Sequence, residues 1–268
     1  MKTQSDLKQL FSKMWQHYCQ LNPEAQRVYN CITAAGENVE NDHIAFRTVS
    51  LPEVNKDVLA QFFTQYGYIK KGEYVFKDKK LTAHHFEHTD ANMPKVFISQ
   101  LELDWCSHYV KTELTKAIQS ASFKNLNDES LLYSGKHWSA FYAIYLNLYE
   151  ESEYAAWFYA HGFKPNHFTV YINHLKKLND IQSLNQFLKD NHFKLNQSGG
   201  EIKGSQVDYL EQSSTMASEV PVRFGEGIYN VPGCYYEFAK RYPLSDGSLY
   251  QGFVEKSADK IFESTNQI

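Results

Sequence analysis

The sequence has few of the features that mark secreted, fibrous or membrane proteins. Its four cysteines are widely scattered and form no C-x-x-C pair, a usage that favours reduced thiols over a disulfide framework. Glycine and proline are scarce, at 13 and 7 of 268 residues, which argues against disorder or a fibrous fold. The N-terminus has no apolar signal-peptide core. The longest apolar run, Trp138 to Tyr149, is interrupted and too short to span a bilayer. We therefore expect a cytoplasmic protein.

The sequence also lacks an excess of positive charge. Lysine and arginine number 27 against 31 acidic residues, for a net charge of −4, so neither nucleic acid nor an anionic membrane is expected as the main partner. No P-loop, G-x-G-x-x-G or G-x-S-x-G motif occurs, which removes the usual signals for nucleotide binding and for a nucleophile-elbow hydrolase. A small molecule remains as the expected partner, and nothing here indicates an oligomeric state.

Aromatic residues, in contrast, are abundant. They make up 15% of the chain, with 18 Phe, 19 Tyr and 4 Trp, enough for a large core or a deep pocket. We expect one domain over residues 1–268, because the length suits a single large core. Its expected parts are an N-terminal helical hairpin (1–36), a first β-α-β-β-β unit (42–104), a helical insert (105–163), a second such unit (164–242) and a C-terminal closing segment (243–268). In the hairpin, Ser5 is expected to cap the first helix and Asn22-Pro23 to start the second. Gly162 is expected to end the last helix of the insert.

The order of the predicted elements suggests an internal repeat. In the first unit, strands are expected at 42–49, 73–77, 80–88 and 95–103, with a helix at 52–68. In the second unit, strands are expected at 166–173, 192–195, 205–211, 220–224 and 234–241, with a helix at 178–191. Two such units make an α+β fold with a curved sheet around a cavity, a plan that glyoxalase-like and extradiol-dioxygenase proteins resemble.

Three strands of this plan carry side chains that suit a metal ion. Because strand side chains alternate between faces, His43 and Arg47 share one face of their strand. His167 and Glu237 lie on the polar faces of two later strands, so all four are expected on the cavity side. Two imidazoles and one carboxylate suit an open octahedral Fe(II) site. A zinc site with water as nucleophile uses the same ligands.

Each of these residues also has a structural interpretation. A strand histidine is more often a hydrogen-bonded structural residue than a ligand. Arg47 could pair with one of the many acids, and Glu237 could be a surface carboxylate beside neighbouring cations. The other strand histidines, His84, His85 and His88, are interpreted as pocket wall or solvated residues, since no convergent carboxylate is evident near them.

At these positions the sequence resembles a known family. The stretches HIAFRT, ESEYAAWFYAHGFKPNHFTVYIN, LEQSSTMASEV and VPGCYYEFAKR are similar to the 2-oxoadipate dioxygenase/decarboxylase family, first catalogued as a domain of unknown function. The resemblance extends from about Asp42 to the C-terminus, and PNHFTV and YYEF are its most specific parts.

The resemblance implies a fold, a site and a reaction. It implies a glyoxalase-like fold in which His43, His167 and Glu237 hold a non-haem Fe(II) ion, with Arg47 binding the substrate. In the C-terminal stretch SLYQGFVEKSADKIFES, Lys256 and Ser257 occupy the pocket-contacting positions, and Lys256 departs from the apolar residue expected there. The implied reaction converts a 2-oxo diacid and O₂ into a shortened 2-hydroxy diacid and CO₂.

Two other functions fit the same residues. One is a hydrolase or glyoxalase-like isomerase that depends on zinc or another divalent metal, using the same His/His/Glu ligands. The other is a small-ligand binding protein that has the cavity without the chemistry. Oxygen consumption separates the dioxygenase from the hydrolase or isomerase, and ligand affinity without turnover identifies the binding protein.

Overall fold

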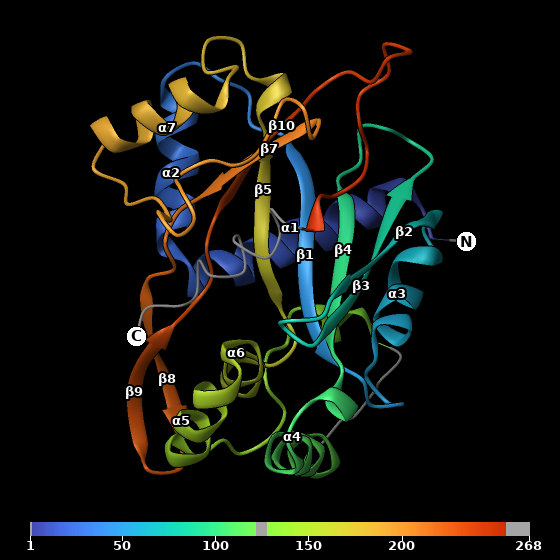
Figure 1. The fold of residues 1–268 in the computed structure, drawn as a ribbon, viewed down its shortest axis with the longest axis vertical. Helices are drawn as coiled ribbons and strands as arrows, with labels where there is room; N and C mark the ends of the chain where they lie inside the picture. The colour runs from blue at the N-terminus through green and yellow to red at the C-terminus, as the bar shows by residue number, and fades with distance from the viewer. Residues whose placement is uncertain (1, 122–127, 256–268) are drawn as a thin grey trace.

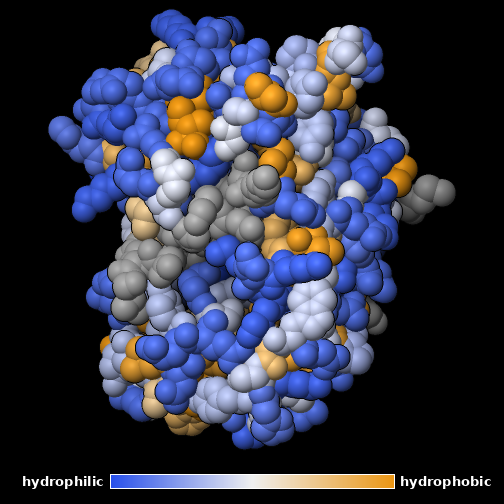
Figure 2. Space-filling view, viewed as in Figure 1, coloured by the Kyte–Doolittle hydropathy of each residue, from blue (hydrophilic) through white to orange (hydrophobic). Residues whose placement is uncertain are grey.

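The computed structural model describes residues 2–121 and 128–255. Its centre is a curled mixed sheet of eight strands, with helices behind the sheet, beside it and at one end (Figure 1). On the face shown in Figure 2, apolar residues lie in small separate groups among hydrophilic ones, a distribution usual for a globular protein surface. Within the described ranges, no helix combines the length and the apolar character needed to cross a bilayer.

The expected N-terminal hairpin is confirmed, and it consists of α1 (Gln4–Leu21) and α2 (Pro23–Ala34). The cap predicted at Ser5 is wrong. Thr3 caps α1 instead, because its hydroxyl accepts from the amide of Asp6 while the Asp6 carboxylate accepts from the Thr3 amide, which forms a capping box. Asn22 caps α2, as the Asn-Pro pair predicts.

The first β-α-β-β-β unit comprises β1 (Asn41–Val49), α3 (Lys56–Thr64), β2 (Tyr68–Phe76), β3 (Leu81–His88) and β4 (Lys95–Leu101). In this unit β1 pairs in parallel with β4, whereas β4, β3 and β2 follow one another antiparallel. The helix is shorter than predicted because the Asn55 side chain accepts from the amides of Asp57 and Val58 and so starts the helix after the loop.

The helical insert lies at one end of the sheet (Figure 1). It contains η1 (Leu103–Trp105), α4 (His108–Ser120), η2 (Glu129–Leu132), α5 (Tyr142–Glu151) and α6 (Glu153–His161). Residues 154–161 of α6 are all buried, because the helix is packed between its neighbours rather than on a surface. Gly162 ends it with a positive φ of 69°, as the glycine predicts.

The second unit comprises β5 (Pro165–Tyr171), η3 (Ile172–His174), α7 (Ile181–Asp190), β6 (Lys203–Ser205), β7 (Leu210–Ser214) and β10 (Glu237–Arg241). The hairpin of β8 (Glu219–Phe224) and β9 (Gly227–Pro232) is inserted before the last strand and forms a separate two-stranded sheet. The main sheet has the order β2-β3-β4-β1-β5-β10-β7-β6, so each unit has the same order around the join of β1 and β5. The predicted repeat is therefore confirmed.

Two strand predictions in the second unit are wrong. Residues 192–195 form a turn and a coil with one isolated bridge at Leu195. The predicted strand 205–211 is mostly a turn, because the Ser205 hydroxyl and carbonyl both accept from the amide of Asp208. The strand predicted at 220–224 is confirmed as β8, and it belongs to the separate hairpin rather than to the main sheet. Alternation of side chains predicts extended backbone and does not identify the partner strand.

Candidate metal centre

The join between the two units brings the two predicted histidines together. Strands β1 and β5 pair antiparallel, with Ala45 opposite His167 and His43 opposite Thr169. Strand β10 lies parallel on the other side of β5, with Glu237 beside Thr169. Side chains on paired residues project to the same face of a sheet. The three predicted ligands therefore meet over the small side chain of Thr169.

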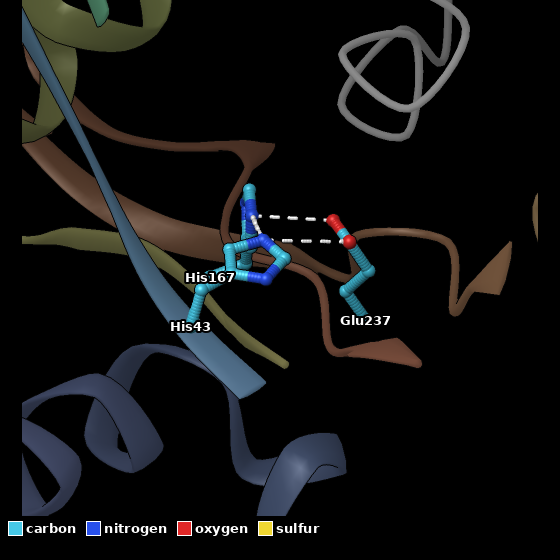
Figure 3. Close-up of side chains that lie close together, drawn as sticks. All are labelled: His43, His167 and Glu237. Atoms are coloured by element: carbon cyan, nitrogen blue, oxygen red, sulfur yellow. Dashed lines mark hydrogen bonds and ion pairs between the residues drawn. The ribbon is translucent and has the colours of Figure 1, made fainter. Parts of the chain in front are cut away.

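The ligand atoms of His43, His167 and Glu237 lie close enough to share one ion (Figure 3). The two Nε2 atoms are 3.4 Å apart. The carboxylate oxygens of Glu237 lie 3.5 Å from Nε2 of His43 and 3.2 Å from Nε2 of His167. An ion bound at about 2.1 Å holds neighbouring ligand atoms roughly 3.0 to 3.5 Å apart in octahedral or tetrahedral geometry, so the spacing fits a divalent metal.

Burial prepares these side chains to hold a cation. Desolvation lowers the pKa of His43 and of His167, so both rings are neutral and offer lone pairs. Desolvation raises the pKa of Glu237 to about 8, because a carboxylate that is 1% exposed has lost its hydration. A divalent cation between the three groups would compensate the buried negative charge, so the donor set fits a metal ion.

A second layer of hydrogen bonds sets the direction of each ligand. The Nδ1–H of His43 donates to Asp42 at 2.8 Å, and that of His167 donates to Asn166 at 3.0 Å. These bonds leave each Nε2 as the acceptor that faces the centre. The amide of Gln212 donates to Glu237 at 2.6 Å. The sequence analysis missed these orienting residues, although the Asp-His and Asn-His pairs at equivalent strand positions were a visible signal.

The repeat also shows why the site has three ligands. The register makes His43 equivalent to His167 and Ala45 equivalent to Thr169. The residue beside Ala45 that corresponds to Glu237 is Phe97. A symmetric fourth ligand is thus replaced by an apolar ring, which leaves coordination positions for exogenous groups on a six-coordinate ion.

Aromatic rings cover two of the ligands. Tyr235 stacks on the ring of His167, with centroids 4.7 Å apart and planes at 28°. Phe253, from the chain after β10, meets the ring of His43 edge-on at 4.8 Å and also contacts Phe97. Both aromatic residues are buried. They limit the access of water to the ligands.

Arg47 lies on the expected face but is already engaged. It is 1% exposed, and its Nη1 donates to Oε1 of Glu153 at 2.9 Å. Its guanidinium also lies over the rings of Tyr154 and Trp157, with the guanidinium carbon 4.8 and 5.0 Å from the centroids. The structural interpretation of Arg47 as an ion-pair partner is therefore correct for its present contacts, and its substrate role stays a prediction.

The other strand histidines and the predicted C-terminal contacts are not part of the three-residue cluster. The expectation that no carboxylate lies near the other strand histidines is wrong. His85 bonds to the Tyr74 hydroxyl and to Glu87, and His84 lies 3.4 Å from Asp57 and 3.8 Å from Glu73. His88 contacts the carbonyl oxygen of Tyr66 and the amide of Asp90. Among the described residues, His43, His167 and Glu237 form the one cluster of three or more metal-ligand side chains. The predicted contacts Lys256 and Ser257 lie outside the described residues.

The fold and the site together define a class of protein. The sheet has a glyoxalase-like arrangement: a protein from Ralstonia eutropha that carries the provisional description of a glyoxalase superfamily protein superimposes with a TM-score of 0.75 at 20% identity, over 91% of this chain and 83% of its own. The molecule therefore has a glyoxalase-like fold with a candidate metal site formed by three buried side chains.

The family follows from comparison with known sequences. The family model for 2-oxoadipate dioxygenase/decarboxylase matches residues 3–132 and 132–248. The chain therefore belongs to this family, as the sequence resemblance predicts.

Two solved structures are similar over nearly the whole chain. The hydroxyglutarate synthase of Oryza sativa, solved in complex with 2-oxoadipate, is 33% identical with a TM-score of 0.91, over 97% of this chain and 92% of its own. A protein from Shewanella frigidimarina that carries the provisional description of a hydrolase is 45% identical with a TM-score of 0.90, over 95% of this chain and all of its own.

Proposed function

We propose that this chain is a non-haem Fe(II)-dependent dioxygenase that decarboxylates a 2-oxo diacid of the 2-oxoadipate type. A six-carbon 2-oxo diacid and one O₂ would give the five-carbon 2-hydroxy diacid and one CO₂. All atoms of the two reactants are then contained in the two products, and no further reductant is required.

One observation carries the proposal. Two imidazoles and one carboxylate from three strands converge on one point on the same face of the sheet. Two His and one carboxylate with open positions are typical of Fe(II) oxygenases. Membership of the 2-oxoadipate dioxygenase/decarboxylase family and the 2-oxoadipate bound to the rice relative support the substrate class.

The residues of this chain would divide the work as follows. His43, His167 and Glu237 hold the ion, which would supply the redox chemistry and the Lewis acidity when bound. Arg47 offers a planar guanidinium to one substrate carboxylate. Because Glu153 already binds this guanidinium, the substrate carboxylate would share Arg47 with Glu153 or displace it. Tyr235 and Phe253 exclude water.

The closing contacts belong to the same proposal. The resemblance assigns Lys256 and Ser257 to the substrate pocket. They follow Phe253 in the sequence by three and four positions, and Phe253 lies against His43. A substrate with two carboxylates suits two sets of contacts, one at Arg47 and one at this segment. Chain length of the diacid would then be set by the distance between the two.

A second candidate is a hydrolase or isomerase that uses zinc or another divalent metal. The neutral imidazoles and the carboxylate suit zinc equally well, and the description of the Shewanella frigidimarina relative as a hydrolase favours testing it. A ligand-binding protein without turnover is the third candidate.

Oxygen consumption separates these functions. Protein purified anaerobically and loaded with Fe(II) should consume O₂ and release CO₂ from 2-oxoadipate in equal amounts. The zinc-loaded protein and the His167→Ala variant are the controls, and both should be inactive. Equal turnover without O₂ would overturn the dioxygenase assignment. Measurable affinity for 2-oxoadipate without turnover under any metal would identify a binding protein.

A further inference from the structure

A buried ion pair lies directly behind one metal ligand. Arg241, at the end of β10, donates to the Asp42 carboxylate from Nε at 2.6 Å and from Nη2 at 2.8 Å. The same carboxylate accepts from Nδ1 of His43 at 2.8 Å. Arg241 and Asp42 are both buried, and two parallel bonds fix the carboxylate plane. The direction of the His43 ring therefore depends on Arg241.

The other edge of the same guanidinium holds the chain that closes the site. Its Nη1 donates to the carbonyl oxygens of Tyr250 at 3.1 Å and Gly252 at 2.8 Å. The guanidinium carbon lies 5.3 Å from the ring centroid of Phe253. In Figure 1 the red end of the described chain lies over β1 and β4, in agreement with the contacts of this ring to His43 and Phe97.

These contacts form a closed circuit. It runs from His43 through Asp42 and Arg241 to the carbonyls of residues 250 and 252, and returns to His43 through Phe253. The amide of Phe253 donates to the Tyr74 hydroxyl at 3.2 Å. Hydrogen exchange of this amide therefore reports on whether the segment is in place.

Within residues 2–121 and 128–255, no such circuit backs the second histidine. Nδ1 of His167 donates to the neutral amide of Asn166 at 3.0 Å, and the ring is stacked on Tyr235. The two ligands are equivalent in the repeat, yet one is backed by a charged pair and the other by an amide. Asn166 therefore serves as an internal control.

We propose that Arg241 is a positioning residue that couples the orientation of His43 to the seating of segment 250–253. A metal ion on Nε2 of His43 requires the ring orientation that the hydrogen bond to Asp42 fixes. Arg241 holds Asp42 in place only while its guanidinium is bonded both to Asp42 and to the carbonyl oxygens of Tyr250 and Gly252. The coupling is reciprocal: metal binding stabilises the seated segment, and release of the segment weakens metal binding. The inference rests on the metal centre of the proposed function and not on the substrate.

The first test uses the unmodified protein and Co(II) alone. Hydrogen exchange of the Phe253 amide should slow on addition of Co(II), because the metal stabilises the seated segment. An exchange rate that is the same with and without bound Co(II) would overturn the coupling.

The second test separates the circuit from general effects of mutation. Arg241→Lys retains the charge but loses the fork, and we expect a Co(II) dissociation constant raised about 10- to 100-fold, faster exchange at 250–253 and a shifted visible spectrum of bound Co(II). Phe253→Leu leaves the buried pair intact, should fold normally, and should show the same changes in smaller measure. Asn166→Ala should weaken Co(II) binding without changing exchange at 250–253.

Co(II) affinity within twofold of the wild type in both Arg241→Lys and Phe253→Leu would overturn the proposal. The outcome is independent of turnover. A protein that shows the coupling but consumes no O₂ with 2-oxoadipate would contradict the proposed function alone, whereas an active enzyme with unaltered variants would contradict the coupling alone.

Discussion

At the scale of single residues, the polar groups on the ligand-bearing face of the sheet differ in what they contact. The three ligands face one another across 3.2 to 3.5 Å, while Arg47 is held by Glu153 and two aromatic rings. A guanidinium with a fixed plane binds a carboxylate in two-pronged fashion better than a flexible ammonium does. The geometry therefore suits Arg47 for recognition and the triad for the metal.

Replacing Arg47 by lysine tests its role in substrate binding. Because lysine cannot form the paired bonds, we expect the KM for 2-oxoadipate to rise about 10- to 100-fold, with Fe(II) affinity unchanged. Steady-state kinetics measures the first quantity and metal titration the second. An unchanged KM would remove Arg47 from the substrate site, and Arg223→Lys at an exposed position of β8 serves as a matched control.

A buried histidine outside the metal site makes stability depend on pH. His161 is buried and bonds through Nε2 to the carbonyl oxygen of Pro232 at 2.8 Å. Desolvation lowers the pKa of His161 to about 3. Between pH 6.5 and 3 this histidine is therefore protonated in the unfolded chain and neutral in the folded protein. Its contribution to stability is complete above pH 6.5 and falls by about 1.4 kcal/mol per pH unit below it.

The His161→Gln variant isolates that contribution, because the amide can still donate to the carbonyl of Pro232. Between pH 6.5 and 5 the wild type should lose about 2 kcal/mol more unfolding free energy than the variant. Denaturant titrations at the two pH values give the difference. Parallel pH profiles for the two proteins would show that His161 is protonated in the folded state.

At the scale of elements, the ends of helices and the pairing of strands position the site. Helix α6 presents Glu153 and Tyr154 to Arg47 and ends at Gly162, whose φ of 69° and ψ of −142° suit glycine alone. A Cβ at this position would lie 2.4 Å from backbone atoms of Lys136. The turn thus ties α6 to the start of β5 and so to His167.

Gly162→Ala should therefore be costly, by about 3 kcal/mol of unfolding free energy, from backbone strain and a backbone clash. Gly247→Ala is the matched control. Its φ is +84°, but no atom lies within 4 Å of the added Cβ, so strain alone should cost about 1 kcal/mol. Thermal unfolding of both variants gives the comparison, and equal losses would contradict the clash.

At the scale of the whole molecule, the metal centre joins the two units. Its candidate ligands come from β1 in the first unit and from β5 and β10 in the second. One ion would thus link His43 and Glu237, which are more than 190 positions apart in the sequence. An ion that binds the folded protein alone stabilises it by mass action.

Removal of the metal should lower stability. At a free metal concentration about 100 times the dissociation constant, the loss on chelation is about 2.7 kcal/mol, seen as a lower unfolding temperature. The His167→Ala variant should unfold at the same temperature with and without chelator. A chelator-dependent shift of full size in that variant would place the stabilising ion elsewhere.

The local patterns of the chain determined much of this outcome. Alternation placed His43 and Arg47 on one face, and the repeated order of elements predicted the two units. The glycine that ends α6 and the Asn-Pro pair that starts α2 were also readable, because their effects depend on neighbours in the sequence. The division into one domain, the compartment and the roles of Lys256 and Ser257 stay predictions.

Tertiary structure alone decided which partner each element and side chain meets. The predictions of strands at 192–195 and 205–211 are wrong, because a local preference for extended backbone does not determine whether a partner strand lies alongside. Likewise, Arg47 meets Glu153, and Arg241 meets both Asp42 and the chain at residues 250–252, through contacts between residues far apart in sequence. Such contacts depend on the register of β1, β5 and β10, which is set by the summed packing of both faces of the sheet.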